Sequence, residues 1–335
     1  LGSVTNVRWG DDDVNNSVQL KRSIEDLQQM LINFTTLKGK KYGIKINETE
    51  GANLLTRYNC RTAINHKNAK KILSAALQRL TLETLFNEIE QYFKQKTKSS
   101  KDQTSTTPTS TTTTSNNNNS GSGDLKPKDP VDDVERDIIA YTYRLNYYID
   151  KFRNHRQGTD DLTRITPIKI RQQVYAILGI RGFIKKHEAI PSTKSSNDDN
   201  NEAIESPPTS NEHSHYFIDS LVKKCLNIMA MHREIKYDAK MEQQYREETE
   251  AMVIEVVHLY LRLHTQEPIP EFRKFFSSGE EIHASLMSGP EVADDDSGEQ
   301  VVEICSFPLI ATQGNKVLCK AQVETRPVST SFWKK

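Results

Sequence analysis

The chain has 335 residues, of which 35% are hydrophobic, and its 45 Lys and Arg residues balance 45 Asp and Glu residues. This length suffices for two domains, and the charge balance excludes a global field that would attract nucleic acid or an anionic membrane. No apolar run reaches the roughly 18 residues that a membrane-spanning helix needs, so none is predicted.

The first part of the chain has the pattern of a helical block. Apolar residues recur every three or four positions between residues 20 and 31, which predicts an amphipathic helix with Asn16 or Ser17 as its cap. We expect a short strand at 42–46 and a short helix at 52–58. The strongest helix should follow Asn65, which can cap it, and run to Tyr92.

A long polar stretch then divides the chain. Residues 98–130 are almost wholly Ser, Thr, Asn, Gly and Lys, and so have nothing apolar with which to offset the entropy of ordering. We predict a disordered linker there, between an N-terminal helical domain at 1–97 and a C-terminal one at 131–326. A second polar stretch, at about 188–212, predicts a disordered insertion, and 327–335 form a tail.

Four helices are expected in the C-terminal block. The first spans 131–155, and the second begins at Thr166 and Pro167, a cap followed by a proline at the first helical position. The others span 216–233 and 236–264. The last is apolar on most sides, which is typical of a central core helix.

Near the C-terminus the apolar residues change to a period of two. Alternation from Val317 to Val323 predicts a half-buried strand, with 301–307 as its partner and a turn at 313–315. We therefore expect a mainly α fold, with two helical blocks joined by the linker and a short β-hairpin packed on the second block.

The four cysteines lie far apart, with no C-x-x-C pair. In the predicted hairpin Cys319 faces Ile310 and not Cys305, which disfavours a disulfide across the ladder. Reduced, packed thiols are the preferred interpretation, and they suit a cytoplasmic protein.

Two clusters could carry chemistry. His213, His215 and Cys225 could ligate zinc, but no fourth ligand has a fitting spacing, so we predict no metal site and no cofactor. His258 shares a helical stripe with Glu255 and Arg262 and could be a general base with an orienting carboxylate. A polar edge of a packed helix is the preferred interpretation.

Six aromatic residues of the second block mark a possible interaction surface. The same helix carries Lys151, Arg153 and Arg156, so base stacking with phosphate contacts is an alternative, although the aromatic spacing favours packing against a core or a partner helix. Each aromatic group could equally belong to the core. The candidates are Tyr141, Tyr148, Phe152, Phe272, Phe275 and Phe276.

Several segments resemble a large uncharacterised protein family that is expanded in arbuscular mycorrhizal fungi. They are residues 171–183, 266–270 and 302–310, together with 9–13 and 20–37. This resemblance implies a fungal source and an intracellular protein, and brings no activity. Residues ~165–326 are also similar, in the order of their elements, to the C-terminal region of plant gravitropic-in-the-light type proteins, which implies a regulatory or scaffold role beside receptor kinases and the cell cortex.

The sequence therefore predicts a non-catalytic cytoplasmic interaction or adaptor protein that binds protein partners. One alternative is an enzyme of an unfamiliar class with a pocket near His258. Another is a nucleic-acid-binding protein that uses the helix at 141–156. The identity of the partners and the oligomeric state stay open.

Overall fold

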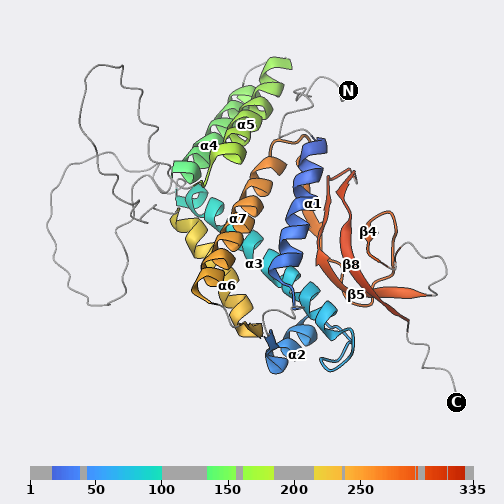
Figure 1. Cartoon of the computed structure of the whole chain (residues 1–335). Coiled ribbons are helices and arrows are strands. Elements are labelled where there is room, and N and C mark those ends of the chain that lie inside the picture. The colour runs from blue at the N-terminus through green and yellow to red at the C-terminus, as the bar shows by residue number, and fades with distance from the viewer. Residues whose placement is uncertain are drawn as a thin grey trace, which may run out of the picture.

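The computed structural model describes residues 17–37, 44–99, 134–155, 161–184, 215–235, 238–290, 292, 299–314 and 316–328. Within them it has seven helices and eight short strands, which confirms the predicted mainly α fold with C-terminal strands (Figure 1). The helices are α1 (Ser17–Phe34), α2 (Glu48–Arg57), α3 (Ala69–Ser99), α4 (Val134–His155), α5 (Asp161–Arg181), α6 (Tyr216–His232) and α7 (Ala239–Leu263). The strands are β1 (Lys45–Ile46), β2 (Arg233–Glu234), β3 (Glu271–Lys274), β4 (Met287–Ser288), β5 (Gln300–Phe307), β6 (Leu309–Ala311), β7 (Val317–Cys319) and β8 (Ala321–Pro327).

Several sequence predictions concern residues outside these ranges. They are the linker at 98–130, apart from the last two residues of α3, the insertion at 188–212, most of the tail, the segment at 9–13, and the candidates His213 and Arg156.

Local signals explain where α2 and α7 begin, although the sequence predicted these helices at 52–58 and 236–264. Asn47 caps α2 by accepting a hydrogen bond from the backbone N–H of Glu50, at 3.3 Å, and Asp238 caps α7 by accepting one from Met241, at 2.8 Å. In α1 the residues at the predicted apolar spacing, from Leu20 to Leu31, are buried. These helices follow from capping and periodicity alone.

The predicted start of α5 at Thr166 and Pro167 is wrong. The helix begins at Asp161, and Pro167 lies inside it. The hydroxyl of Thr166 donates to the carbonyl of Leu162 at 2.7 Å and therefore does not cap a following N–H group. Proline inside a helix removes one backbone hydrogen bond; here α5 as a whole packs along α4, and Ile165 and Ile168 on either side of the proline are half-buried.

The strands form two three-stranded sheets, with orders β3-β6-β7 and β4-β8-β5, besides the small β1-β2 pair. Cys319 lies opposite Ile310, as predicted. Residues 301–307 pair antiparallel with β8, at 321–327, and not with the whole of the predicted partner at 317–323; Cys305 lies opposite Val323. The predicted single strand from Val317 to Val323 is divided at Lys320, so that β7 and β8 join different sheets. Strands β3 and β4 were not anticipated.

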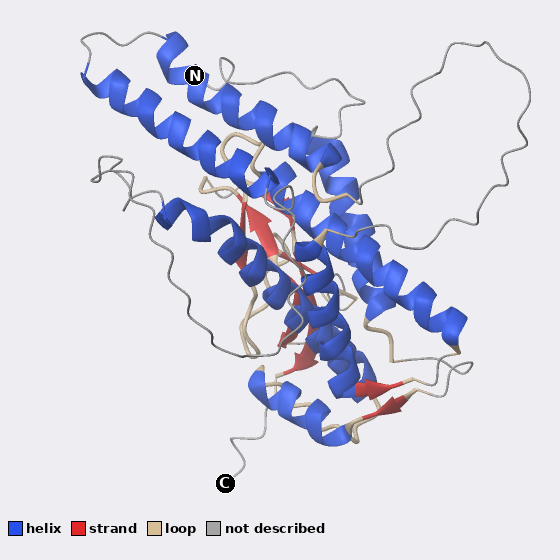
Figure 2. Ribbon diagram, turned by 90° about the vertical axis from the view of Figure 1, so that its left-hand side faces the viewer, coloured by secondary structure: helices blue, strands red, loops and turns tan. Residues whose placement is uncertain are grey.

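Both predicted blocks contribute to one hydrophobic core, which includes Leu20 from α1, Leu77 from α3, Val256 from α7 and Ile310 from β6. The strands were expected on the second block, but β5 packs along α3. Figures 1 and 2 show α1 and α3 between the sheets on one side and α6 and α7 on the other, with α4 and α5 at one end. The first block is therefore the middle layer of the fold.

Polar contacts also join the two blocks. The carboxylate of Glu303, which is 0% exposed, accepts hydrogen bonds from the N–H and the hydroxyl of Thr62, each at 2.7 Å. Its second oxygen lies 2.7 Å from Nε of Arg326. A buried carboxylate of β5 thus holds the loop before α3.

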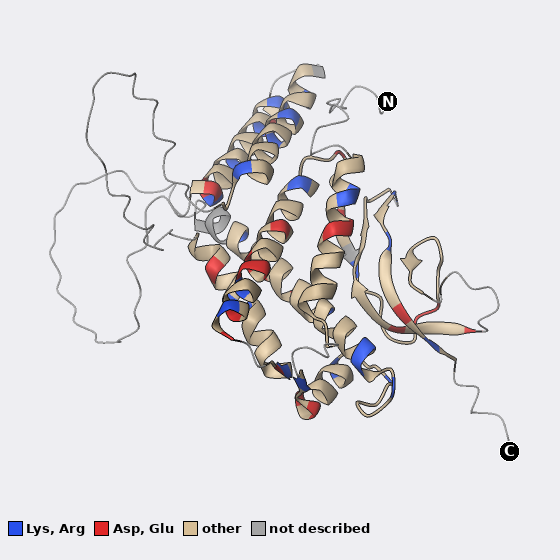
Figure 3. Ribbon diagram, in the orientation of Figure 1, with Lys and Arg blue, Asp and Glu red and all other residues tan. Residues whose placement is uncertain are grey.

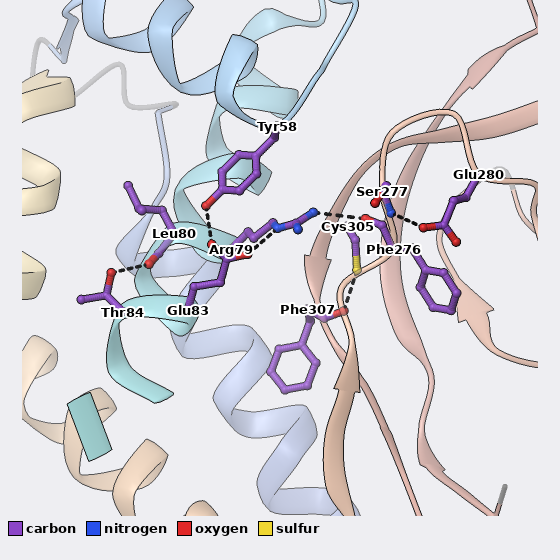
Figure 4. Close-up of polar contacts among 10 residues, drawn as sticks. All are labelled: Tyr58, Arg79, Leu80, Glu83, Thr84, Phe276, Ser277, Glu280, Cys305 and Phe307. Atoms are coloured by element: carbon purple, nitrogen blue, oxygen red, sulfur yellow. Dashed lines mark hydrogen bonds and ion pairs between the residues drawn. The ribbon is translucent and has the colours of Figure 1, made fainter. Parts of the chain in front are cut away.

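A second tie centres on Arg79 of α3 (Figure 4). Its Nε lies 2.7 Å from Glu83, and its Nη1 donates to the carbonyl of Phe276 at 3.1 Å. The hydroxyl of Tyr58 donates to the other oxygen of Glu83 at 2.9 Å. Burial, and then the Glu83 charge, raise the pKa of Tyr58 well above its usual range, so this hydroxyl remains a donor.

Candidate functional site: the outer seam of α4

The predicted interaction residues separate into two groups. Phe276 is 3% exposed, and the ring of Phe272 stacks on Phe86 with centroids 3.8 Å apart. The ring of Phe275 lies 5.0 Å from the guanidinium of Arg79. These three belong to the interior, which was the alternative interpretation.

The aromatic residues of α4 have the opposite surroundings. Tyr141 is 67% exposed, Tyr148 47% and Phe152 57%. Single exposed apolar residues are normal, but several on one face of a helix mark an interaction site.

These residues are part of a longer stripe, which we call the outer seam. Its members follow one another at alternating spacings of four and three, the pattern of the two apolar positions in a coiled-coil heptad. All are exposed, between 38% and 67%. The outer seam consists of Val134, Ile138, Tyr141, Leu145, Tyr148 and Phe152.

Another side of α4 packs against the rest of the protein, mainly α5 and α3. Ile139 and Thr142 are buried, and Asn146 and Ile149 are half-buried. At about 100° per residue, these positions lie roughly a third of a turn from the seam. The helix therefore buries its less apolar side and exposes its more apolar one.

The first turn of α4 is fixed by Glu135. Its carboxylate accepts a hydrogen bond from the N–H of Phe183 at 3.2 Å and lies 3.6 Å from Nε2 of His215. Burial by itself would raise the pKa of Glu135, but the nearby His215 ring and the backbone hydrogen bonds outweigh it and lower the pKa. Phe183 has a φ of 60°, a strained conformation for a bulky residue, and this bond helps to hold it. The seam thus stands on a well-anchored helix.

Charged residues line one edge of the seam at seven-residue intervals: Asp137, then Arg144, then Lys151. Asp137 is half-buried, whereas Arg144 and Lys151 are exposed. Arg144 donates to the hydroxyl of Tyr148 at 3.5 Å, with its guanidinium 5.7 Å from the ring centroid. On the opposite edge Thr142 and Ile149 face the protein, so only the charged edge is open to a partner.

His258 is buried, and its ring is hydrogen-bonded to the backbone. Its Nε2 lies 2.7 Å from the carbonyl oxygen of Gly182, so this nitrogen carries the proton and donates. Burial lowers the pKa of His258. Glu255, the proposed orienting carboxylate, lies 2.5 Å from Nη2 of Arg262. These contacts tie α7 to the end of α5 and use the groups that a general base would need.

The proposed zinc ligands have structural roles where they are described. The ring of His215 caps α6 by accepting from the N–H of Phe217 at 3.2 Å, while Cys225 is 0% exposed in the core. Burial raises the pKa of the Cys225 thiol to about 12. Across the described ranges, no three His, Cys, Asp or Glu side chains gather as metal ligands.

Residues within the described ranges line two open cavities. One, of about 550 Å³, lies between α6 and α7, and its Arg233 already donates to Phe34 O and to the hydroxyl of Tyr245, each at 2.8 Å. The other, of about 400 Å³, lies between α1, α3 and the sheet, where Lys71 pairs with Glu324. Neither includes His258 in its lining.

No protein-family model, curated protein or solved structure matches the chain. Two seam residues, Val134 and Ile138, were missed from the sequence, although they continue the spacing of Tyr141 and Leu145 towards the N-terminus.

Proposed function

We propose that the protein is a non-catalytic interaction or adaptor protein, and that the outer seam of α4 is the surface on which it docks a helix. The observation that supports this is the exposure of an uninterrupted heptad stripe on an anchored helix. An amphipathic helix normally turns such a stripe to the core, because burial of apolar area stabilises the fold. A stripe that faces outward is stabilised when another helix covers it.

A cytoplasmic location is part of the proposal. All four cysteines are free thiols in the structure, which suits a reducing compartment. No helix within the described ranges is sufficiently long and apolar to cross a bilayer. The resemblance to the fungal family and to plant scaffold-type proteins also agrees with an intracellular adaptor.

The test compares two double variants of the full chain in affinity capture from cytosol. Tyr141→Ala with Tyr148→Ala removes the centre of the seam. Tyr143→Ala with Tyr147→Ala is the matched control, because these tyrosines are also exposed, 67% and 57%, on the same helix but lie outside the seam at about 100° per residue. Only the ring of Tyr147 touches the seam, edge-on to Tyr148 with centroids 5.6 Å apart.

The seam variant should lose partners that the wild type and the control retain. Equal recovery by all three proteins would refute docking at the seam. Turnover of a metabolite that depends on His258 would instead favour the enzyme hypothesis.

Nucleic-acid binding through α4 is the weaker alternative. Lys151 is exposed, but Arg153 is half-buried and lies 3.7 Å from Asp150, and acidic residues interrupt the basic ones along the helix (Figure 3). Retention on a phosphate polymer that falls steeply with salt would favour this alternative.

A further inference from the structure

We propose that the outer seam is covered by α4 of a second copy of this chain, in an antiparallel, two-fold symmetric pair. This inference rests on the proposed function, since it names the helix that docks on the seam. A two-fold interface must be self-complementary, because the same patch is used by both subunits. The outer seam meets this condition in size and in charge.

Size complementarity follows from one antiparallel register. The seam residues fall into two sets that repeat every seven residues: Ile138, Leu145 and Phe152 form one set, and Val134, Tyr141 and Tyr148 form the other. In an antiparallel pair, residues of one set face residues of the other set on the second helix. With the axis near Tyr143, every layer then pairs an aromatic ring with an aliphatic side chain. The layers join Ile138 with Tyr148, Leu145 with Tyr141, and Val134 with Phe152 of the partner subunit.

A parallel pair would match the same residues poorly. It would place each position opposite itself, so that Tyr141 would face a tyrosine, Phe152 a phenylalanine and Val134 a valine. Thin layers would gather near Val134 and Ile138 and bulky ones near Tyr148 and Phe152, and the helices could not keep a constant separation along the seam.

The charged edge selects the same orientation. In the antiparallel register Asp137 lies beside Lys151 of the partner subunit, and symmetry repeats the pair. Glu135 and Arg153 take no part in this pairing, because Glu135 contacts Phe183 and His215, and Arg153 contacts Asp150, within the same subunit. Antiparallel helices also align their dipoles favourably. Arg144 meets its own copy at the axis, which is the one unfavourable contact.

The shape of the molecule leaves room for this pair. Figure 1 shows α4 and α5 side by side and extending past the end of α7. The first turn of α4 contacts α3 through Arg136, whose guanidinium lies 5.2 Å from the ring centroid of Tyr92, and it contacts the residue that caps α6 through Glu135 and His215. An antiparallel partner therefore brings its own body to the far end of the helix pair.

The mass of the full chain is the first measurement. Sedimentation velocity over a range of concentrations should show a species of about twice 38.3 kDa, which dissociates on dilution. Tyr141→Ala with Tyr148→Ala should weaken the dimer by tenfold or more, whereas Tyr143→Ala with Tyr147→Ala should leave it unchanged. A monomer at all concentrations overturns the proposal.

A charge swap tests the orientation. Asp137→Lys and Lys151→Glu each place like charges together twice in their own homodimers, and should each weaken self-association about tenfold. Mixed together, they restore both attractive pairs, so the heterodimer should form at wild-type affinity. Absence of this preference, with the dimer intact, overturns the antiparallel register.

Oxidative cross-linking tests the register independently. Arg144→Cys should give a disulfide-linked dimer, because residue 144 meets its copy at the two-fold axis. Leu145→Cys is the control, since position 145 meets itself only in a parallel pair. A monomeric protein whose seam still captures other proteins contradicts self-pairing but not the proposed function, whereas failure of capture as well contradicts both.

Discussion

Replacement of Glu303 by glutamine should destabilise the whole fold. The side chain is 1% exposed, and glutamine keeps its shape and its acceptor for Thr62. It removes the charge that neutralises Arg326, whose side chain is only 16% exposed. Removal of one partner from a buried ion pair costs about 3–5 kcal/mol. Because Arg326 is partly solvated, we expect a loss of about 2–4 kcal/mol in the free energy of unfolding.

The matched control is Glu324→Gln on the neighbouring strand. Glu324 pairs with Lys71, but their side chains are 19% and 44% exposed. Such exposed pairs contribute about 0–1 kcal/mol. Urea unfolding followed by far-ultraviolet circular dichroism measures both variants, and hydrogen exchange shows which helices lose protection.

Since Glu303 contacts Thr62 across the shared core, α1 and α7 should lose protection together in Glu303→Gln. An effect no larger than that of Glu324→Gln would show that the buried pair is not a stabilising tie. Loss of protection confined to the strands would refute the conclusion that both blocks unfold as one body.

Three further predictions concern the interior. Arg79→Met should cost about 2–4 kcal/mol in urea unfolding, because it leaves the carboxylate of Glu83 without its cation; a loss below about 0.5 kcal/mol would contradict this. Burial lowers the pKa values of His258 and His264, so on acidification the unfolded state takes up protons before the folded state does. The free energy of unfolding should therefore fall as the pH drops through about 6.5 and below. Replacement of both histidines by Gln should flatten this pH dependence, and an unchanged slope would refute the explanation. Burial raises the pKa of Cys305 to about 12, so its thiol should react with a disulfide reagent at pH 8 only after unfolding; fast labelling of the native protein would contradict its placement.

Most helices could be predicted because their signals are local. Asp238 stands immediately before α7, and the buried residues of α1 recur at the helical period in the sequence. The start of α5 could not be predicted in the same way. Thr166 and Pro167 are typical of a helix start, but the helix begins at Asp161, in an element that packs along α4.

Among the strands, too, some could be predicted from the local sequence and others could not. The contact of Ile310 with Cys319 was predictable because a short turn sets their register. Strands β3 and β4 have four and two residues and no alternation of their own. They become strands only because β6 and β8 present free edges to them, and such non-local pairing leaves no trace in the local sequence.

The sequence alone determined the mainly α class and the heptad spacing of α4, since both depend on residues within a few turns of one another. It did not determine which side of that helix meets solvent. Tyr141 and Phe276 both looked like interaction or core residues, but the first is exposed on α4 and the second is buried in a cluster with Met287, Val302 and Val323. Exposure depends on which distant segments cover a face, and the covering segments are selected by the whole fold.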